Sequence, residues 1–190
     1  MSVQIRALVP GDDRGQFSSG NPDLDRFFHR FAGQNQFRHH IGVTYVAVDG
    51  DEILGFVTVS PSEIEIDALP AERRRRLPRY PLPVLRVARL AVSAQAQGRR
   101  IGQALLRFAL TLASRTADEI GCVGVVVDAK PEALGFYLTY GFEPLFTFEG
   151  ALLDRPEPTP MFLPLSAIPP PADQWSPVGQ RSPTARPRSG

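Results

Sequence analysis

The chain has 190 residues, of which 43% are hydrophobic and 22% are charged, and its formal net charge is +1. These values are typical of a single globular domain, and the length is sufficient to bury a core without covalent cross-links. The single cysteine, Cys122, excludes an internal disulfide and a multi-cysteine metal site. No apolar run approaches the roughly 20 residues of a membrane helix, and no signal segment opens the chain, so we expect a cytoplasmic protein.

The N-terminal part predicts a strand followed by a helix. Residues 3–8 have the pattern of a short strand. Residues 20–38 have that of a helix in which Asn21 is the N-cap and Pro22 the first helical residue. Apolar side chains recur in this helix at intervals of three and four residues, which places them on one face. We expect this face to pack on the core; it carries Leu24, Phe27, Phe28 and Phe31.

The middle of the chain predicts antiparallel strands and then an arginine-rich connection. Two β-rich runs within residues 43–60 flank Asp49-Gly50-Asp51, a sequence that favours a tight hairpin turn. Residues 69–83 contain four prolines, which disrupt strand pairing and favour a short helix followed by an extended loop. Residues 84–92 are almost continuously apolar from Val87 on, as in a central strand.

The next elements are a long helix, a strand and a short helix. The long helix follows residue 100, and its predicted core face carries Ile101, Ala104, Leu105, Phe108 and Leu112. Residues 122–128 predict a buried strand, which makes Cys122 an unreactive core thiol. Residues 130–142 predict a short helix that ends at Gly141.

Two closing strands and a tail complete the predicted organisation. The strands are expected within residues 143–148 and 161–165. After Leu165 the sequence has six prolines in 25 residues and no periodicity, so residues 1–165 are expected to form the domain and residues 166–190 a disordered tail. Hairpins combined with a central strand–helix–strand–helix portion predict an α/β fold with a mixed sheet.

The connection from the central strand to the long helix, QGRRIG (residues 97–102), combines glycines with arginines. Backbone N–H groups at a helix start have no partner inside the helix and attract anions, phosphate above all. No lysine follows, which excludes a P-loop, and the glycine spacing does not fit a dinucleotide fold. The ligand is therefore expected to carry phosphate in another setting.

Residues 97–102 resemble the acetyl-CoA turn of the GNAT superfamily of N-acetyltransferases, Q/R-x-x-G-x-G/A between a central strand and a helix. The matching positions are Gln97, Gly98, Arg99, Ile101 and Gly102. Two further superfamily motifs stand at the expected places and consist of Arg89-Leu90-Ala91-Val92 before the turn and Phe136-Tyr137 with Gly141-Phe142 after it. The resemblance implies the GNAT fold, with a mixed central sheet flanked by helices.

The resemblance also implies acetyl-CoA as the cosubstrate and gives roles to these residues. Backbone groups of Leu90, Ala91 and Val92 would hold the thioester carbonyl and the pantetheine, and the turn would hold the CoA diphosphate. Tyr137 would give a proton to the departing thiolate, as a phenol of pKa about 10 can do while it stays neutral at pH 7. Tyr140, three residues further on, is the alternative acid.

Arg100 departs from the family pattern, which usually has glycine at this position. Three consequences are open: the side chain crowds the diphosphate, points outward, or contacts a phosphate itself. We expect cofactor binding to be retained, because the backbone amides of residues 98–102 remain and two cations are added beside them.

A closer resemblance covers approximately residues 5–165 and concerns the acetyltransferase toxins of bacterial toxin–antitoxin pairs. Its more specific pieces are F-x-x-G-x-x-x-L-D, from Phe17 to Asp25, and Pro81-Leu82-Pro83 before the central strand. Such toxins acetylate the α-amine of amino acids charged on tRNA and so stop translation. They are restrained by a separate ribbon-helix-helix antitoxin and are often dimers. The resemblance implies the same substrate and partner here, and makes a homodimer an expectation.

Seven arginines lie within 17 residues of the chain. They could grip an RNA backbone in a salt-dependent manner, or form a solvated face that contacts no ligand, and the sequence leaves both alternatives open. The candidate tRNA-binding residues are Arg73, Arg74, Arg75, Arg76, Arg79 and Arg89, with Arg86 as the seventh arginine of the group.

No residue stands out as a general base, which suits an α-amine of pKa about 7.7–8 because such an amine loses its proton near neutral pH. The weak candidates are His39, His40, Glu63 and Glu65. Two other functions remain open. One is a GNAT enzyme acting on a small amine or a protein N-terminus, and the other is a catalytically weak module that binds acyl-CoA or an antitoxin.

Overall fold

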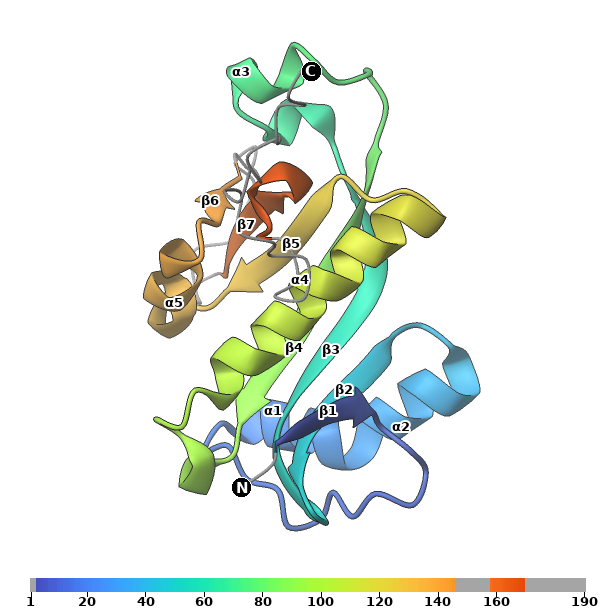
Figure 1. The fold of residues 1–190 in the computed structure, drawn as a ribbon, viewed down its shortest axis with the longest axis vertical. Helices are drawn as coiled ribbons and strands as arrows, with labels where there is room; N and C mark the ends of the chain where they lie inside the picture. Colours follow the sequence, from blue (N-terminus) through green and yellow to red (C-terminus); the bar gives the residue numbers. More distant parts are fainter. Residues whose placement is uncertain (1–2, 146–157, 170–190) are drawn as a thin grey trace, which may run out of the picture.

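The computed structural model describes residues 3–145 and 158–169, which form a seven-stranded mixed sheet with helices on both faces (Figure 1). The strand order is β1-β2-β3-β4-β5-β7-β6, and the central pair β4–β5 is parallel. The strands are β1 (Gln4–Ala7), β2 (Val43–Asp49), β3 (Glu52–Ile64), β4 (Leu82–Val92), β5 (Gly124–Ala129), β6 (Glu143–Pro144) and β7 (Thr159–Pro164). The predicted α/β fold with a mixed sheet and a central fourth strand is confirmed.

The helices follow the predicted order. They are α1 (Pro22–Arg26), α2 (Ala32–Gln34), α3 (Ala71–Arg74), α4 (Ile101–Glu119) and α5 (Leu134–Thr139). The α1–α2 segment is one helical stretch interrupted by π-helical turns at Phe27–Phe31 and Asn35–His39. Its start is as predicted, because the Asn21 side chain accepts hydrogen bonds from the N–H groups of Asp23 and Leu24 at 3.1 and 3.2 Å.

Different helices cover the two faces of the sheet. α4 crosses one face (Figure 1), where Leu105 packs in a core cluster with Val57 and Val87. The α1–α2 segment covers part of the other face, where the Phe28 ring stacks on Phe56 with 4.3 Å between centroids and 4° between planes. Phe56 and Val57 are neighbours on β3, so their side chains point to opposite faces, and the sheet has a core on each side.

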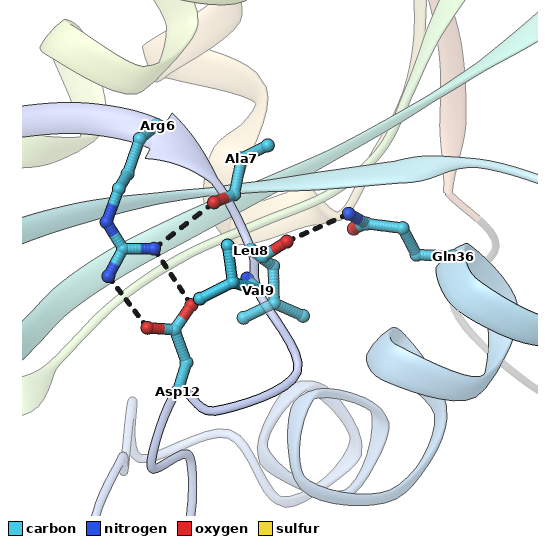
Figure 2. Close-up of polar contacts among 6 residues, drawn as sticks. All are labelled: Arg6, Ala7, Leu8, Val9, Asp12 and Gln36. Carbon is cyan, nitrogen blue, oxygen red and sulfur yellow. Dashed lines mark hydrogen bonds and ion pairs between the residues drawn. The ribbon is translucent and has the colours of Figure 1, made fainter.

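Polar contacts fasten the α1–α2 segment to the edge of the sheet (Figure 2). The Arg6 guanidinium forms a two-point ion pair with the Asp12 carboxylate, with N···O distances of 2.7 and 2.9 Å. Gln36 donates from Nε2 to the carbonyl oxygen of Leu8 at 3.0 Å and accepts at Oε1 from the N–H of Thr44 at 2.9 Å. The Gln36 bonds join the end of the helical segment to β2 and to the residue after β1, and the Arg6–Asp12 pair ties β1 to the loop that leads to α1.

Two predicted core faces are partly wrong. Phe31 is 44% exposed, because the π-helical turn that contains it has more residues per turn than an α-helix and rotates Phe31 away from the core. In α4, two of the five predicted residues, Ile101 and Leu105, are buried, whereas the other three are half-buried. The remaining buried residues of α4 are Leu106, Ala109, Leu110 and Ala113, because the broad sheet surface buries a wider and slightly rotated stripe.

The two closing strands form at the predicted places, whereas residues 166–168, expected to begin the disordered tail, are part of the folded domain. β6 pairs antiparallel with β7, and residues 146–148 of the first predicted strand lie outside the described residues. Leu165–Ala167 form a 3-10 turn and Ile168 packs against the core on the α4 side, while residues 170–190 of the predicted tail also lie outside the described residues.

Three smaller expectations can be compared with the structure. Cys122 is buried as predicted, and its thiol donates to the carbonyl oxygen of Gly124 at 3.2 Å. Gly141 ends the α5 region with φ of 85°, the left-handed conformation expected there. Within the two described ranges, no helix is both long and apolar enough to cross a bilayer.

Candidate active site

The parallel strands β4 and β5 separate toward their C-terminal ends and leave a cleft in the middle of the sheet. Only Leu85, Arg86 and Val87 of β4 have Cα partners in β5, although β4 continues for five further residues. The cleft that opens there has a volume of about 390 Å³. It is lined by residues 19–21 and 24 of the α1 region, residues 87–92 of β4, residue 97, and residues 127, 128, 130, 132, 133 and 137 from β5 to α5.

A β-bulge lies in β4 where the strands separate. Consecutive residues Thr58 and Val59 of β3 pair with Arg89 and Val87, so Ala88 has no Cα partner on β3. Because β5 has diverged at this point, the β4 backbone that follows the bulge is an edge along the cleft. The predicted carbonyl-binding residues 90–92 belong to this edge. The bulge itself was missed, because a register shift depends on a partner strand and leaves no mark in the β4 sequence.

The predicted anion-binding turn adjoins the same cleft and leads into α4. Gly98 has φ of 78°, and the first N–H groups of α4 have no partner inside the helix. Gln97 lines the cleft and donates from Nε2 to the carbonyl oxygen of Ser19 at 3.2 Å, which ties the turn to the segment before α1. A Cβ on Gly102 would lie 3.4 Å from the Val92 side chain, so this glycine allows α4 to begin close against β4.

Arg100 has a left-handed backbone conformation at the start of α4. Its φ of 61° lies in the left-handed region that glycine adopts without strain, which explains why this position suits glycine. The residue is exposed, is not part of the cleft lining and makes no capping bond to α4. An outward-pointing side chain and one that contacts a phosphate at the start of α4 both fit this exposed position.

Tyr137 stands in the wall of the cleft, on α5. It is only 6% exposed, and its ring makes edge contacts with Phe136 and Phe142 at centroid distances of 5.2 and 5.4 Å. Burial disfavours the phenolate and raises the pKa of Tyr137 to about 12. In the part of the chain that the structure describes, no group hydrogen-bonds its hydroxyl, which leaves the proton for a ligand. Tyr140, the alternative acid, is not part of the cleft lining.

The cleft also contains charged residues that the motifs did not single out, namely Asp128, Lys130 and Glu132. Asp128 could have been noticed, since it is a lone charge at the end of an apolar strand. Arg89 enters from the α1 side, where its guanidinium lies 3.9 Å from the centroid of the Phe27 ring, and burial lowers the pKa of Arg89.

The structure does not bring the other candidate tRNA-binding arginines to this cleft. α3 lies at the opposite end of the sheet from the start of α4 (Figure 1), and the eleven residues of β4 between them span about 33 Å. Two of these side chains form ion pairs, Arg73 with Glu143 at 3.0 Å and Arg74 with Asp67 at 3.2 Å. The remaining three, called here the exposed arginine group, are Arg75, Arg76 and Arg79.

None of the weak candidates for the general base lies at the cleft. His39 and His40 end the α1–α2 segment, and Glu63 and Glu65 lie at the far end of β3 and just beyond it. All four are absent from the cleft lining. The carboxylates that do line it belong to Asp128 and Glu132.

A mixed sheet split at its central parallel pair, with a helix start at one end of the cleft and a phenol in its wall, defines a CoA-dependent acyltransferase. The model of the GNAT acetyltransferase domain matches residues 40–144. The tRNA-acetylating toxin of Mycobacterium tuberculosis (strain H37Rv) is 34% identical over 139 residues, which cover 73% of this chain and 82% of that protein. The chain therefore belongs to the GNAT acetyltransferases and is an N-acetyltransferase that uses acetyl-CoA.

Solved structures share the fold. AtaT complexed with acetyl-methionyl-tRNAfMet superposes with a TM-score of 0.77 at 24% identity, covering 88% of this chain and 97% of that one. A tyrosine-to-phenylalanine variant of AtaT bound to the C-terminus of the antitoxin AtaR and acetyl-CoA gives 0.69 at 23% identity, covering 88% and 96%. Both likenesses cover 88% of this chain and so show that the whole fold is shared.

Proposed function

We propose that this enzyme transfers an acetyl group from acetyl-CoA to the α-amine of an amino acid charged on tRNA, and that it acts as the toxin of a toxin–antitoxin pair. The observation that carries the proposal is the split between β4 and β5, where the bulge, the start of α4 and Tyr137 meet. The acceptor is inferred from the curated relative, a tRNA-acetylating toxin, and from the AtaT complex with an acetylated aminoacyl-tRNA.

The residues present fit acetyl-CoA. The unpaired N–H groups at the start of α4 suit a diphosphate, and the β4 edge after Ala88 offers backbone groups to an amide-containing pantetheine arm. When bound, acetyl-CoA supplies a thioester that an amine can attack. Arg100 is exposed beside this turn and is not part of the cleft lining. A catalytically weak module that binds acyl-CoA is the alternative function, and turnover of an acceptor amine excludes it.

Tyr137 is proposed as the general acid. With a pKa of about 12 the phenol remains protonated throughout the physiological range, so its proton is always in place when the CoA sulfur departs. The phenol regains a proton from the nitrogen that has formed the amide, so no net proton is consumed at the residue. The strong hydrophobic packing around its ring holds the hydroxyl in one position.

An α-amine is an acceptor that suits this cleft, whose lining, among the residues that the structure describes, contains the carboxylates of Asp128 and Glu132 but no histidine. A lysine side chain, with a pKa of about 10.4, would need a base to become nucleophilic near neutral pH, whereas an α-amine at about 7.7–8 is already partly neutral. An aminoacyl group on tRNA presents such an α-amine on a polyanion. The exposed arginine group, on the same molecule but distant from the cleft, is proposed to contact the tRNA backbone.

A partner and a compartment follow from the same proposal. The variant AtaT structure contains the C-terminus of an antitoxin, and we propose that a separately encoded antitoxin likewise restrains this enzyme. Because charged tRNA is its proposed substrate, the enzyme is placed in the cytoplasm.

The decisive experiment is mass spectrometry of charged tRNA after incubation with the purified enzyme and acetyl-CoA. We expect one added acetyl group on the amino acid. Tyr137→Phe should lower kcat by about 10²- to 10⁴-fold, the usual contribution of a general acid. Tyr140→Phe is the matched control and should leave kcat nearly unchanged. Unmodified charged tRNA under conditions in which the wild-type enzyme releases CoA with another amine would refute the proposed acceptor.

A further inference from the structure

The ion pair between Arg86 and Asp128 bridges β4 and β5 at the point where the two strands part. One Arg86 terminal nitrogen lies 3.1 Å from Asp128 Oδ2, and both side chains are 41% exposed. Arg86 pairs with Val126 in the parallel ladder, and Asp128 follows the last ladder position by one residue. The pair therefore stands at the inner end of the cleft, and Asp128 belongs to its lining.

Asp128 faces the side of the sheet opposite to α4. Its neighbours Val127 and Ala129 pack in the core cluster that contains α4, and side chains alternate along a strand. The start of α4, which suits the CoA diphosphate, lies on the face of the sheet that Val127 and Ala129 point to. The carboxylate is therefore on the side from which an acceptor can reach the thioester without displacing the cofactor, the side where Arg89 and the α1 region also line the cleft.

One carboxylate oxygen of Asp128 is paired with Arg86, and the other can accept a hydrogen bond from a ligand. Oδ2 contacts Arg86, whereas Oδ1 has no hydrogen-bond partner within residues 3–145 and 158–169. An amine N–H is the natural donor to such an oxygen. We propose that Asp128 is the positioning residue for the acceptor, accepting a hydrogen bond from the α-amine and aiming its lone pair at the thioester. This inference rests on the proposed function above.

Arg86 compensates the negative charge of the Asp128 carboxylate. A carboxylate alone beside the amine would favour the ammonium form, which has no lone pair and cannot attack. With the Arg86 guanidinium on Oδ2, the pair is neutral overall, so Oδ1 can orient the amine without holding it as an ammonium ion. Glu132, the other carboxylate in the lining, has no ion pair in the part of the chain that the structure describes and lacks this compensation.

The test is steady-state kinetics with charged tRNA and, separately, with an amino-acid methyl ester as a small α-amine. Asp128→Ala should lower kcat/KM for either acceptor by about 10- to 100-fold, the usual loss for a hydrogen bond to a charged group. Asp128→Asn, which keeps an acceptor oxygen, should recover part of that activity. Calorimetric binding of acetyl-CoA should stay within about twofold of wild type, and Asp118→Ala, at an exposed position of α4 outside the cleft lining, should leave the kinetics unchanged.

Arg86→Gln gives a result that a merely structural role would not produce. By leaving the Asp128 carboxylate uncompensated, it should raise the pKa of the bound amine and shift the acid limb of the kcat profile, which reports groups in the enzyme–substrate complex, upward by about one pH unit. An unshifted limb, or an Asp128→Ala enzyme with undiminished kcat/KM for both acceptors, overturns the inference. If wild type acetylates the methyl ester but not charged tRNA, the proposed function fails while the role of Asp128 is still decided with the ester.

Discussion

The buried phenol of Tyr137 should make the stability of the enzyme depend on pH in strongly alkaline solution. The pKa of this group is about 12 in the folded protein, against about 10 in an unfolded chain. Because the folded state binds the proton more tightly, the associated stability is fully present below pH 10 and is lost as the pH rises to 12. Two pKa units at 1.36 kcal/mol each correspond to about 2.7 kcal/mol over that interval.

Tyr137→Phe removes the phenol, and with it this pH dependence, but no other ionisable group. We would compare the free energy of unfolding of wild type and variant, from urea titrations at pH 8, 10 and 11. Between pH 8 and pH 11, the free energy of unfolding of wild type should fall by about 1.4 kcal/mol relative to that of the variant. This is half of the roughly 2.7 kcal/mol expected over the whole range from pH 10 to pH 12. All other residues are common to both proteins, so their contributions cancel in the difference.

Tyr140→Phe, from the same helix region, serves as the control and should show no such change. If the difference between wild type and Tyr137→Phe is constant from pH 8 to pH 11, the phenol is not desolvated in the folded enzyme.

Three further predictions concern the scaffold and the tRNA. Arg100→Gly should raise the free energy of unfolding by about 0.5 kcal/mol in thermal denaturation, because relief of left-handed strain exceeds the entropic cost of glycine; a loss of stability would contradict this. Gly124→Ala should cost about 2–4 kcal/mol in urea unfolding, since its Cβ would collide with the Leu163 carbonyl of β7, and full stability would refute the register. Replacing the exposed arginine group by alanines should reduce the slope of log K for tRNA binding against log salt concentration by up to about three. Turnover of an amino-acid methyl ester should stay unchanged. An unaltered slope would show that these residues do not contact the tRNA.

Local chemistry accounts for what could be predicted from the sequence. Asn21 caps α1 because its side chain satisfies N–H groups two and three residues away, so this signal needs no knowledge of the rest of the fold. The order of strands and helices likewise follows from periodicity. Phe31 shows the limit, because the apolar spacing assumed a regular α-helix and the π-helical turn that moved Phe31 to the surface belongs to the packing of the whole segment.

The same distinction separates the two halves of the site. The turn of residues 97–102 and Tyr137 were found in the sequence because an anion-binding helix start and a tyrosine motif are each contained within a few consecutive residues. The cleft itself, the bulge at Ala88 and the Arg86–Asp128 pair exist only where β4 leaves β5, and that separation depends on contacts among β3, β4 and β5. A linear pattern specifies which groups can act, whereas strand pairing over long separations decides which of them face one another.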